Sequence, residues 1–129
     1  MIKGRALDHI GLACSDVEAA KEFYGSVLGF RVIGTFDCGI GHPVYFMQNG
    51  GVTYEMYQND DIPTDARGKI DHIAYVSRDI EADYAFCRAA GYTVTTNGIE
   101  AIPTFWANGC RYFKIASPTG EQIEFSQIL

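Results

Sequence analysis

Apolar and polar positions alternate in two short runs of nearly identical sequence, LDHIGL at Leu7–Leu12 and IDHIAY at Ile70–Tyr75. The side chains of a strand alternate between its two faces, so each run is predicted to be a strand with its histidine opposite its isoleucine. In both runs the histidine shares its face with a small residue, Gly11 beside His9 and Ala74 beside His72. This leaves space in front of each imidazole ring for a bound group.

Each run is followed by the pattern of an amphipathic helix. Ser15-Asp16-Val17-Glu18 matches a Ser-x-x-Glu capping box, and apolar residues then recur at helical spacing until Gly29. Asp79-Ile80-Glu81 opens the equivalent segment, which ends at Gly91. The sequence predicts two helices of about three turns each. Four acidic residues are predicted to complement the helix N-termini: Asp16, Glu18, Asp79 and Glu81.

The remaining apolar runs predict strands. They are Phe30–Phe36, Val44–Gln48 and Val52–Gln58 in the first half, and Tyr92–Thr96, Cys110–Ala116 and Gln122–Gln127 in the second. Asn49-Gly50-Gly51 is typical of a hairpin turn, and 97–108 is predicted to be irregular. The polar stretch 59–69 contains Pro63 and Gly68 and is the best candidate for a linker. The predicted class is α+β, with two tandem βαβββ modules at about 5–58 and 70–129.

The two halves are related by an internal duplication within a single domain, 1–129. Residues 63 positions apart match along both strand and helix: His9 and His72, Asp16 and Asp79, Glu18 and Glu81, Phe23 and Phe86. Near the end of each half, VTYEMYQ aligns with EQIEFSQ, which places Glu55 opposite Glu124. Each glutamate alternates with apolar residues, so it is predicted to lie on the polar face of its sheet, with the helix on the other face.

Composition narrows the possible partners. The chain of 129 residues has 10 Lys+Arg against 16 Asp+Glu, a net charge of -6, which argues against nucleic acid and anionic membranes as partners. No apolar run approaches the roughly 20 residues of a membrane span, and the first residues lack the apolar core of a signal peptide. A cytoplasmic location is predicted. The four scattered cysteines, without CxxC pairing, are interpreted as small hydrophobic residues.

The matched residues of the two halves form one candidate ligand set: His9, Glu55, His72 and Glu124. Two imidazoles and two carboxylates suit a divalent ion such as Zn, Ni, Co, Mn or Fe better than calcium. A single histidine or glutamate would more often be a satisfied core residue or a solvated strand end. The repetition of both residue types at equivalent positions favours a metal site.

The sequence resembles the glyoxalase I, bleomycin-resistance and dioxygenase superfamily, also called the vicinal oxygen chelate superfamily, over nearly its whole length. The resemblance rests on DHIGL with DVEAAKEFYGSVLGF, on TYEMY, on DHIAY with DIEADYAF, and on the final SPTGEQIEF. It implies two βαβββ modules forming a cupped, barrel-like mixed sheet with the helices outside. It also implies a homodimer, and leaves open whether the cup is completed within one chain or across a swapped dimer.

The resemblance is greatest to glyoxalase I (lactoylglutathione lyase), whose four metal ligands match His9, Glu55, His72 and Glu124. It implies a metal-dependent lyase or isomerase that chelates two neighbouring oxygens of a small substrate, for which a glutathione hemithioacetal is a candidate, and moves a proton through an enediolate. Glu124 is then the first choice for the base and Glu55 for the second acid/base. The alternatives are an enzyme similar to methylmalonyl-CoA epimerase or to thiol transferases, and a non-catalytic drug- or metabolite-binding protein. A ring-cleaving dioxygenase is disfavoured, because Glu55 fills the position that such enzymes leave open.

Two further features bear on the substrate. Glyoxalase I commonly has an arginine four residues after its first metal histidine, for the glutathione carboxylate, and this chain has Ala13 there. Four other arginines are candidates to replace it: Arg5, Arg31, Arg67 and Arg111. Phe105, Trp106 and Tyr112 are candidates for a pocket lining, with core packing as the alternative. His42, in a Gly/Pro-rich loop, is predicted to be a surface residue.

Overall fold

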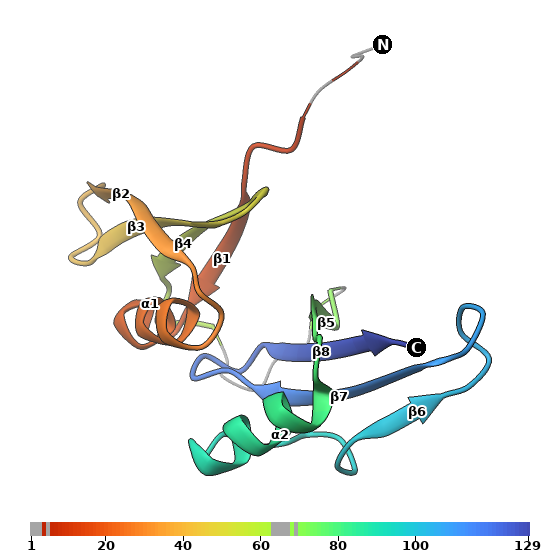
Figure 1. The fold of residues 1–129 in the computed structure, drawn as a ribbon. Helices are drawn as coiled ribbons and strands as arrows, with labels where there is room; N and C mark the ends of the chain where they lie inside the picture. Colours follow the sequence, from red (N-terminus) through yellow and green to blue (C-terminus); the bar gives the residue numbers. More distant parts are fainter. Residues whose placement is uncertain (1–3, 5, 63–67, 69) are drawn as a thin grey trace. The chain divides into compact units, whose positions relative to one another are not determined.

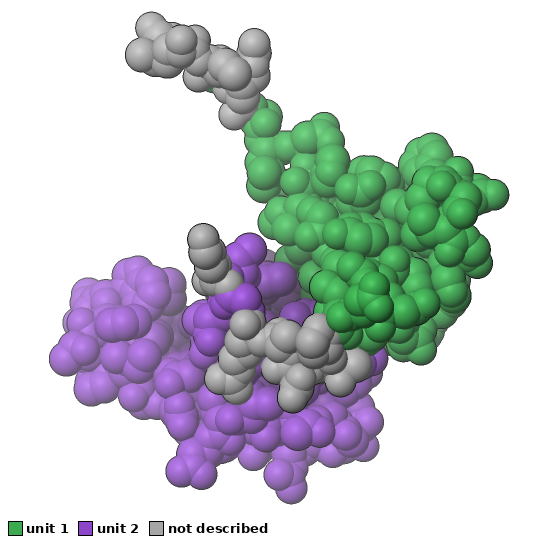
Figure 2. Space-filling view, turned by 180° about the vertical axis from the view of Figure 1, so that it is seen from behind, with its two compact units in different colours: residues 1–63 green, residues 64–129 purple. Residues whose placement is uncertain are grey.

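A computed structural model describes residues 4, 6–62, 68 and 70–129, and the chain divides into two compact units, 1–63 and 64–129 (Figure 2). Each unit has the element order βαβββ (Figure 1). Unit 1 consists of β1 (Ile10–Cys14), α1 (Val17–Ser26), β2 (Arg31–Asp37), β3 (Pro43–Asn49) and β4 (Val52–Gln58). Unit 2 consists of β5 (His72–Val76), α2 (Ile80–Ala89), β6 (Glu100–Ile102), β7 (Cys110–Ala116) and β8 (Gln122–Ile128). The α+β class and the two predicted modules are confirmed.

The two units share one sheet topology. In unit 1 the strand order is β1-β4-β3-β2, and in unit 2 it is β5-β8-β7-β6. The first strand of each unit pairs in parallel with the last, whereas the other neighbours are antiparallel, so both four-stranded sheets are mixed. A parallel pair needs a long crossover, which the helix and the two intervening strands supply. The first and last strands of each unit therefore lie side by side.

Each helix packs on one face of its own sheet. In unit 1, the buried Tyr24 of α1 contacts Tyr54 of β4 edge to face, with ring centroids 5.3 Å apart. In unit 2, Tyr84 of α2 contacts the buried Phe113 of β7 in the same way at 5.2 Å. The apolar neighbours of both glutamates are buried, namely Tyr54, Met56, Ile123 and Phe125. Alternation then places Glu55 and Glu124 on the face opposite the helix, as predicted.

The cysteines bear out their interpretation as small hydrophobic residues in three of four cases. Cys14, Cys87 and Cys110 are buried and Cys38 is exposed, and all four are free thiols. Burial raises the pKa of the Cys87 thiol to about 11, so it stays protonated at neutral pH. Over the ranges that the structure describes, neither helix is long and apolar enough to cross a membrane.

The predicted capping box of the first helix is wrong by one residue. Asp16, not Ser15, is the N-cap, and its carboxylate accepts a hydrogen bond from the backbone N–H of Ala19 at 2.9 Å. Asp79 caps α2 in the same way through Ala82 at 3.1 Å. Glu18 does not close a capping box; it accepts hydrogen bonds from Lys21 and from the Tyr45 hydroxyl. Aspartate is as favourable an N-cap as serine, and the Ser-x-x-Glu pattern does not take the neighbouring aspartate into account.

The edge strand of unit 2 also differs from its prediction. Tyr92–Thr96 forms only an isolated bridge between Val94 and Ile115, whereas β6 lies inside the stretch predicted to be irregular. Both segments pair with β7, and the chain bends between them at Gly98, whose φ is 73°. The first strand of each unit begins later than predicted, at Ile10 and at His72, because pairing with the last strand starts there. His9 therefore directly precedes β1, whereas His72 is the first residue of β5. Of the predicted linker 59–69, residues 63–67 and 69 lie outside the described residues.

The cap assignment can be tested by substitution. Asp16→Ala removes the acceptor for the Ala19 N–H and is expected to lower the free energy of unfolding by about 1 kcal/mol. Ser15→Ala is the matched control and is expected to change it by less than about 0.5 kcal/mol, because the Ser15 hydroxyl is not the cap. Urea unfolding followed by circular dichroism measures both values. Equal losses in the two variants would contradict the assignment to Asp16.

Candidate functional site

The parallel pairing in unit 1 brings His9 to Glu55. Gly11 of β1 is the register partner of Glu55, and His9 lies two residues earlier on the same face. Because Gly11 has no side chain, the Glu55 carboxylate can extend over it toward the imidazole. The contact between His9 Nε2 and Glu55 Oε2 is 3.1 Å, and both side chains are about one-third exposed, at 34% and 33%.

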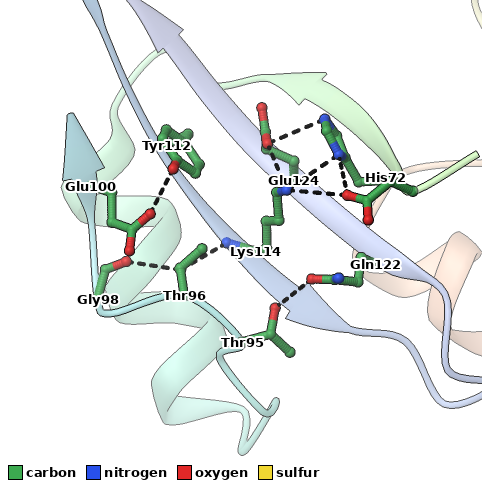
Figure 3. Close-up of polar contacts among 10 residues, drawn as sticks. His72, Thr95, Thr96, Gly98, Glu100, Tyr112, Lys114, Gln122 and Glu124 are labelled. Carbon is green, nitrogen blue, oxygen red and sulfur yellow. Dashed lines mark hydrogen bonds and ion pairs between the residues drawn. The ribbon is translucent and has the colours of Figure 1, made fainter. Parts of the chain in front are cut away.

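Unit 2 repeats this arrangement with a more enclosed glutamate. Ala74 of β5 is the register partner of Glu124, and His72 again lies two residues earlier. His72 Nε2 is 3.4 Å from Glu124 Oε2, and the Glu124 side chain is only 13% exposed. Figure 3 shows the imidazole of His72 and the carboxylate of Glu124 facing one another across the two strands. The structure thus brings the four predicted ligands together as two pairs, one in each unit.

The other ring nitrogen of each histidine, Nδ1, is hydrogen-bonded to the carboxylate of the preceding aspartate. Asp8 Oδ2 lies 2.6 Å from His9 Nδ1, and Asp71 Oδ2 lies 2.9 Å from His72 Nδ1. The hydrogen bond to Asp8, with the charge of Glu55 adding to it, raises the pKa of His9 above its ordinary value of 6.5. The hydrogen bond from His72, supported by Lys114, lowers the pKa of Asp71.

Sequence reasoning missed these two aspartates. They were visible in the repeat itself, since Asp8 and Asp71 are 63 positions apart and directly precede the two histidines. The motif in each half is Asp-His, and not histidine alone. A carboxylate of this kind fixes the tautomer of a metal-ligating histidine.

The donor chemistry of the pairs fits a divalent transition metal. When Nδ1–H donates to the aspartate, the Nε2 lone pair faces the glutamate and is free to bind a metal, with a carboxylate oxygen beside it. Imidazole and carboxylate are suitable ligands for Zn, Mn, Fe, Co and Ni. Within 6–62 and 70–129, no group of three or more His, Cys, Asp or Glu side chains is arranged to hold a metal. Each unit by itself therefore supplies half of the predicted ligand set.

A pocket of about 390 Å³ in unit 2 contains the second pair. It is lined by His72, Ala74, Ile102, Phe105, Trp106, Cys110, Tyr112, Lys114, Glu124 and Ser126. The three aromatic residues predicted as candidates for a pocket lining are all present. Trp106 has a positive φ of 54°, which is uncommon for a bulky residue, and its ring contacts Phe105 edge to face. The connection from β6 to β7 thus gives the pocket an aromatic wall.

The loop that carries this wall depends on a glycine. Gly109 has a φ of 87°, and a Cβ there would lie 2.9 Å from the Cα of Pro103. Two strands of chain can approach this closely only when the side chain is absent. On the pocket floor, the Tyr112 hydroxyl donates to Glu100 at 2.6 Å, and this hydrogen bond raises the pKa of Tyr112 to about 12. Tyr112 therefore stays neutral at physiological pH.

The pocket also contains a cation that sequence reasoning missed. Lys114 of β7 is the register partner of Glu124, and its Nζ lies 3.7 Å from Glu124 Oε2 and 3.2 Å from His72 Nδ1 (Figure 3). The signal that could have found it is alternation in β7, because Lys114 falls on the face of Tyr112 and not on that of the buried Phe113.

Of the four arginines proposed as substitutes at Ala13, the one in the described part of unit 2 points away from this pocket. Arg111 lies on the helix side of β7, where it forms an ion pair with Glu81 of α2. Arg31 is an exposed residue of β2 in unit 1, and Arg5 and Arg67 lie outside the described residues. His42 is exposed in its loop, as predicted.

Comparison with known proteins gives one family. The sequence profile described as the Glyoxalase/Bleomycin resistance protein/Dioxygenase superfamily matches residues 6–125. The uncharacterized protein YwbC of Bacillus subtilis (strain 168) is 32% identical over 127 residues, which span 95% of this chain and 98% of that protein. Among solved structures, a glyoxalase family protein from Enterococcus faecalis aligns with a TM-score of 0.75 at 21% identity, covering 95% of this chain and 97% of that one.

A second solved structure extends the range of relatives. FosX from Listeria monocytogenes, a genomically encoded fosfomycin resistance protein, aligns with a TM-score of 0.72 at 18% identity, covering all of this chain and 96% of that one. At these identities the two structures establish a common fold. They do not assign a substrate.

The role of Asp8 can be tested by titration of the metal-free protein. Because the Asp8 carboxylate favours the protonated imidazole, Asp8→Asn is expected to lower the pKa of His9 toward 6.5, so that the ring loses its proton at a lower pH. Two-dimensional NMR of the ring protons measures this pKa. Asp61→Asn is the control: it removes the same charge beyond the opposite end of β1 and is expected to leave the pKa of His9 unchanged. An unchanged His9 pKa in Asp8→Asn would contradict the role assigned to Asp8.

Proposed function

Because the chain belongs to the Glyoxalase/Bleomycin resistance protein/Dioxygenase superfamily, we propose that it is a metal-dependent lyase or isomerase of the glyoxalase I type. The proposed metal ligands are His9, Glu55, His72 and Glu124, two from each unit, and the ion is Zn, Ni, Co, Mn or Fe. The proposed substrate is a small molecule with two neighbouring oxygens, for which a glutathione hemithioacetal is the first candidate. The proposed working form is a cytoplasmic homodimer.

One observation carries this proposal, the repetition of the complete Asp-His and Glu arrangement in both units. In each, a histidine Nε2 lies within 3.5 Å of a glutamate oxygen, and the other ring nitrogen is bonded to the preceding aspartate. Core histidines that are merely satisfied need only one partner for each N–H. A matched glutamate and a matched aspartate at both sites are what a metal ligand and its orienting carboxylate require.

The proposed chemistry assigns different roles to the two glutamates. A divalent ion, when bound, supplies Lewis-acid stabilisation of negative charge on two substrate oxygens. Glu124 takes the proton from the carbon next to the carbonyl, since its carboxylate is the better shielded from water and faces the pocket of unit 2. Glu55 is the second acid/base and delivers or removes the proton at the adjacent carbon. Phe105 and Trp106 hold the apolar part of the substrate.

The ligand set can be tested with metal alone. Isothermal titration with Zn²⁺, Ni²⁺ or Co²⁺ is expected to show one ion per chain, and His72→Asn is expected to weaken binding at least about 100-fold, because it removes a ligand and not only its support. His42→Asn is the matched control, a histidine outside both pairs, and should bind metal as the wild type does. Equal affinities of the two variants would reject the ligand assignment.

The role of Glu124 is tested by turnover of the hemithioacetal of methylglyoxal and glutathione. Glu124→Gln keeps an oxygen for the metal but removes the base, so kcat is expected to fall at least about 100-fold while much of the metal binding remains. Turnover is followed by absorbance and metal content by elemental analysis of the same sample. Near-normal turnover in Glu124→Gln would eliminate this residue as the base, and no turnover by wild type with any of the five metals would reject the glyoxalase assignment.

A second candidate function is favoured by the aromatic wall. Phe105 and Trp106 are both more than half exposed beside the pocket, at 51% and 62%, which suits a protein that sequesters a drug or metabolite without converting it. Quenching of Trp106 fluorescence, the signal of the single tryptophan in the chain, reports on such binding. A ligand such as fosfomycin is added to the metal-free protein. Saturable quenching, with the ligand recovered intact afterwards, would favour the binding protein over the enzyme.

A further inference from the structure

Lys114 lies inside the pocket of unit 2 without a short hydrogen bond to any one partner. Its Nζ is 3.2 Å from His72 Nδ1, 3.5 Å from Asp71 Oδ2 and 3.7 Å from Glu124 Oε2. Because His72 Nδ1 donates to Asp71, it has no lone pair for the ammonium, and the acceptors of Lys114 are the two carboxylates. Both contacts are longer than the about 2.7–2.9 Å of a charge-assisted hydrogen bond. The side chain is 18% exposed, which is low for a lysine.

The pseudo-symmetry of the chain shows that a His–Glu pair forms at the equivalent place in unit 1 without this cation. In unit 1 the register partner of Glu55 on the neighbouring strand is Phe46, where unit 2 has Lys114 opposite Glu124. The Phe46 ring contacts the imidazole of His9 edge to face, with centroids 5.3 Å apart. His9 and Glu55 thus form their pair beside an aromatic ring. Lys114 is a departure from the repeat that only the pocket of unit 2 contains.

The charges around Lys114 change when the glutamate binds a metal ion. Without metal, the ammonium is offset by Glu124 and Asp71. A divalent ion bound to Glu124 would occupy the carboxylate that now offsets the ammonium, and it would place two further positive charges nearby. The positive charge and the N–H donors of Lys114 would then be less well balanced by the side chains of the pocket. Tyr112 cannot compensate, because it stays neutral and donates to Glu100. An anion from outside would satisfy both cations.

We propose that Lys114 is a specificity-determining residue whose ammonium binds an anionic oxygen group of the substrate, next to the oxygens that the metal chelates. This inference rests on the proposed function, since it takes the pocket with His72 and Glu124 as the substrate site. The substrate class that this favours is a small hydroxy or oxo acid whose carboxylate or phosphonate is adjacent to a further oxygen, in place of the glutathione hemithioacetal named first above, with its apolar part against Phe105 and Trp106.

The test compares two probes that differ in charge alone. Lactate and lactamide have the same size and the same two neighbouring oxygens, but only lactate is an anion. Isothermal titration of the cobalt-loaded protein is expected to show at least about tenfold tighter binding of lactate, because a hydrogen bond between two charged groups is much stronger than one to a neutral amide. The metal itself favours a carboxylate, so the test is the part of the preference that depends on the lysine. Lys114→Met keeps the length of the side chain and is expected to reduce the preference at least about tenfold, whereas Lys114→Arg is expected to keep it.

Lys21→Met is the matched control. This variant changes the net charge of the chain by the same amount, but Lys21 lies in unit 1 against Glu18 and Tyr45. The preference of the Lys21→Met protein for lactate should therefore equal that of the wild type. A second measurement uses only the wild type: the ¹³Cε resonance of Lys114 should shift with lactate and not with lactamide. Absence of a preference in the wild type, an undiminished preference in Lys114→Met, or absence of the NMR shift would each overturn the inference.

Failure of this inference is distinguishable from failure of the proposed function. Metal is titrated first, in the wild type. If no metal binds, the proposed function fails, and lactate and lactamide are titrated into the metal-free wild type and Lys114→Met. A preference for lactate that Lys114→Met abolishes still supports the anion site, and equal binding in the two proteins overturns it.

Discussion

The parallel pairing of the first and last strands in each unit is the constraint on which the candidate site depends. It sets Glu55 opposite Gly11 and Glu124 opposite Ala74, so that each glutamate reaches across a small residue to the histidine two positions earlier. A shift of this register by one residue would turn the glutamate to the helix face, among buried aromatic side chains. The helices that cover the opposite faces, through Tyr24 and Tyr84, hold the register by making such a shift costly.

Much of this could be predicted because it is repeated in the sequence. The matched DHI runs, the 63-residue offset and the aligned glutamates were sufficient for the α+β class, both βαβββ modules and the two faces of each sheet. Periodicity of apolar residues reports which side of an element is buried, and burial is what these sheets and helices depend on.

The sequence-based predictions that were wrong or incomplete concern positions where two neighbouring residues compete for one role, or where residues distant in the sequence decide the structure. Ser15 and Asp16 both satisfy the pattern of an N-cap, and only the backbone geometry decides between them. The edge segment 92–102 is interrupted at Asn97-Gly98, and where it pairs on either side of this bend is set by the neighbouring strand β7. Lys114 was missed because its contact with the candidate site depends on which residue lies opposite it on the neighbouring strand. The register of β7 and β8, not the local sequence, makes it a neighbour of Glu124.

The two units have diverged in what surrounds a common motif. The histidine and glutamate are 46 positions apart in unit 1 and 52 in unit 2, so the second half has gained six residues between them. The connection from β2 to β3 is 38–42, whereas that from β6 to β7 is 103–109 and contains Phe105 and Trp106. The added chain thus contributes to the aromatic wall of the pocket. The two halves thus share the His–Glu pair, and the aromatic pocket wall is a feature of unit 2.

Under the proposed assignments, the charges of unit 2 predict that a metal ion and an anionic substrate bind cooperatively. Lys114 and a metal ion at Glu124 repel one another, so the lysine weakens metal binding as long as its charge is uncompensated. An anion that contacts Lys114 removes part of this repulsion, and the metal in turn attracts the anion. Linkage requires that each then strengthens the binding of the other by the same factor. Phe46 gives unit 1 no such coupling. The replacement of Phe46 by Lys114 at the equivalent register position would therefore make the proposed metal site respond to the charge of its substrate.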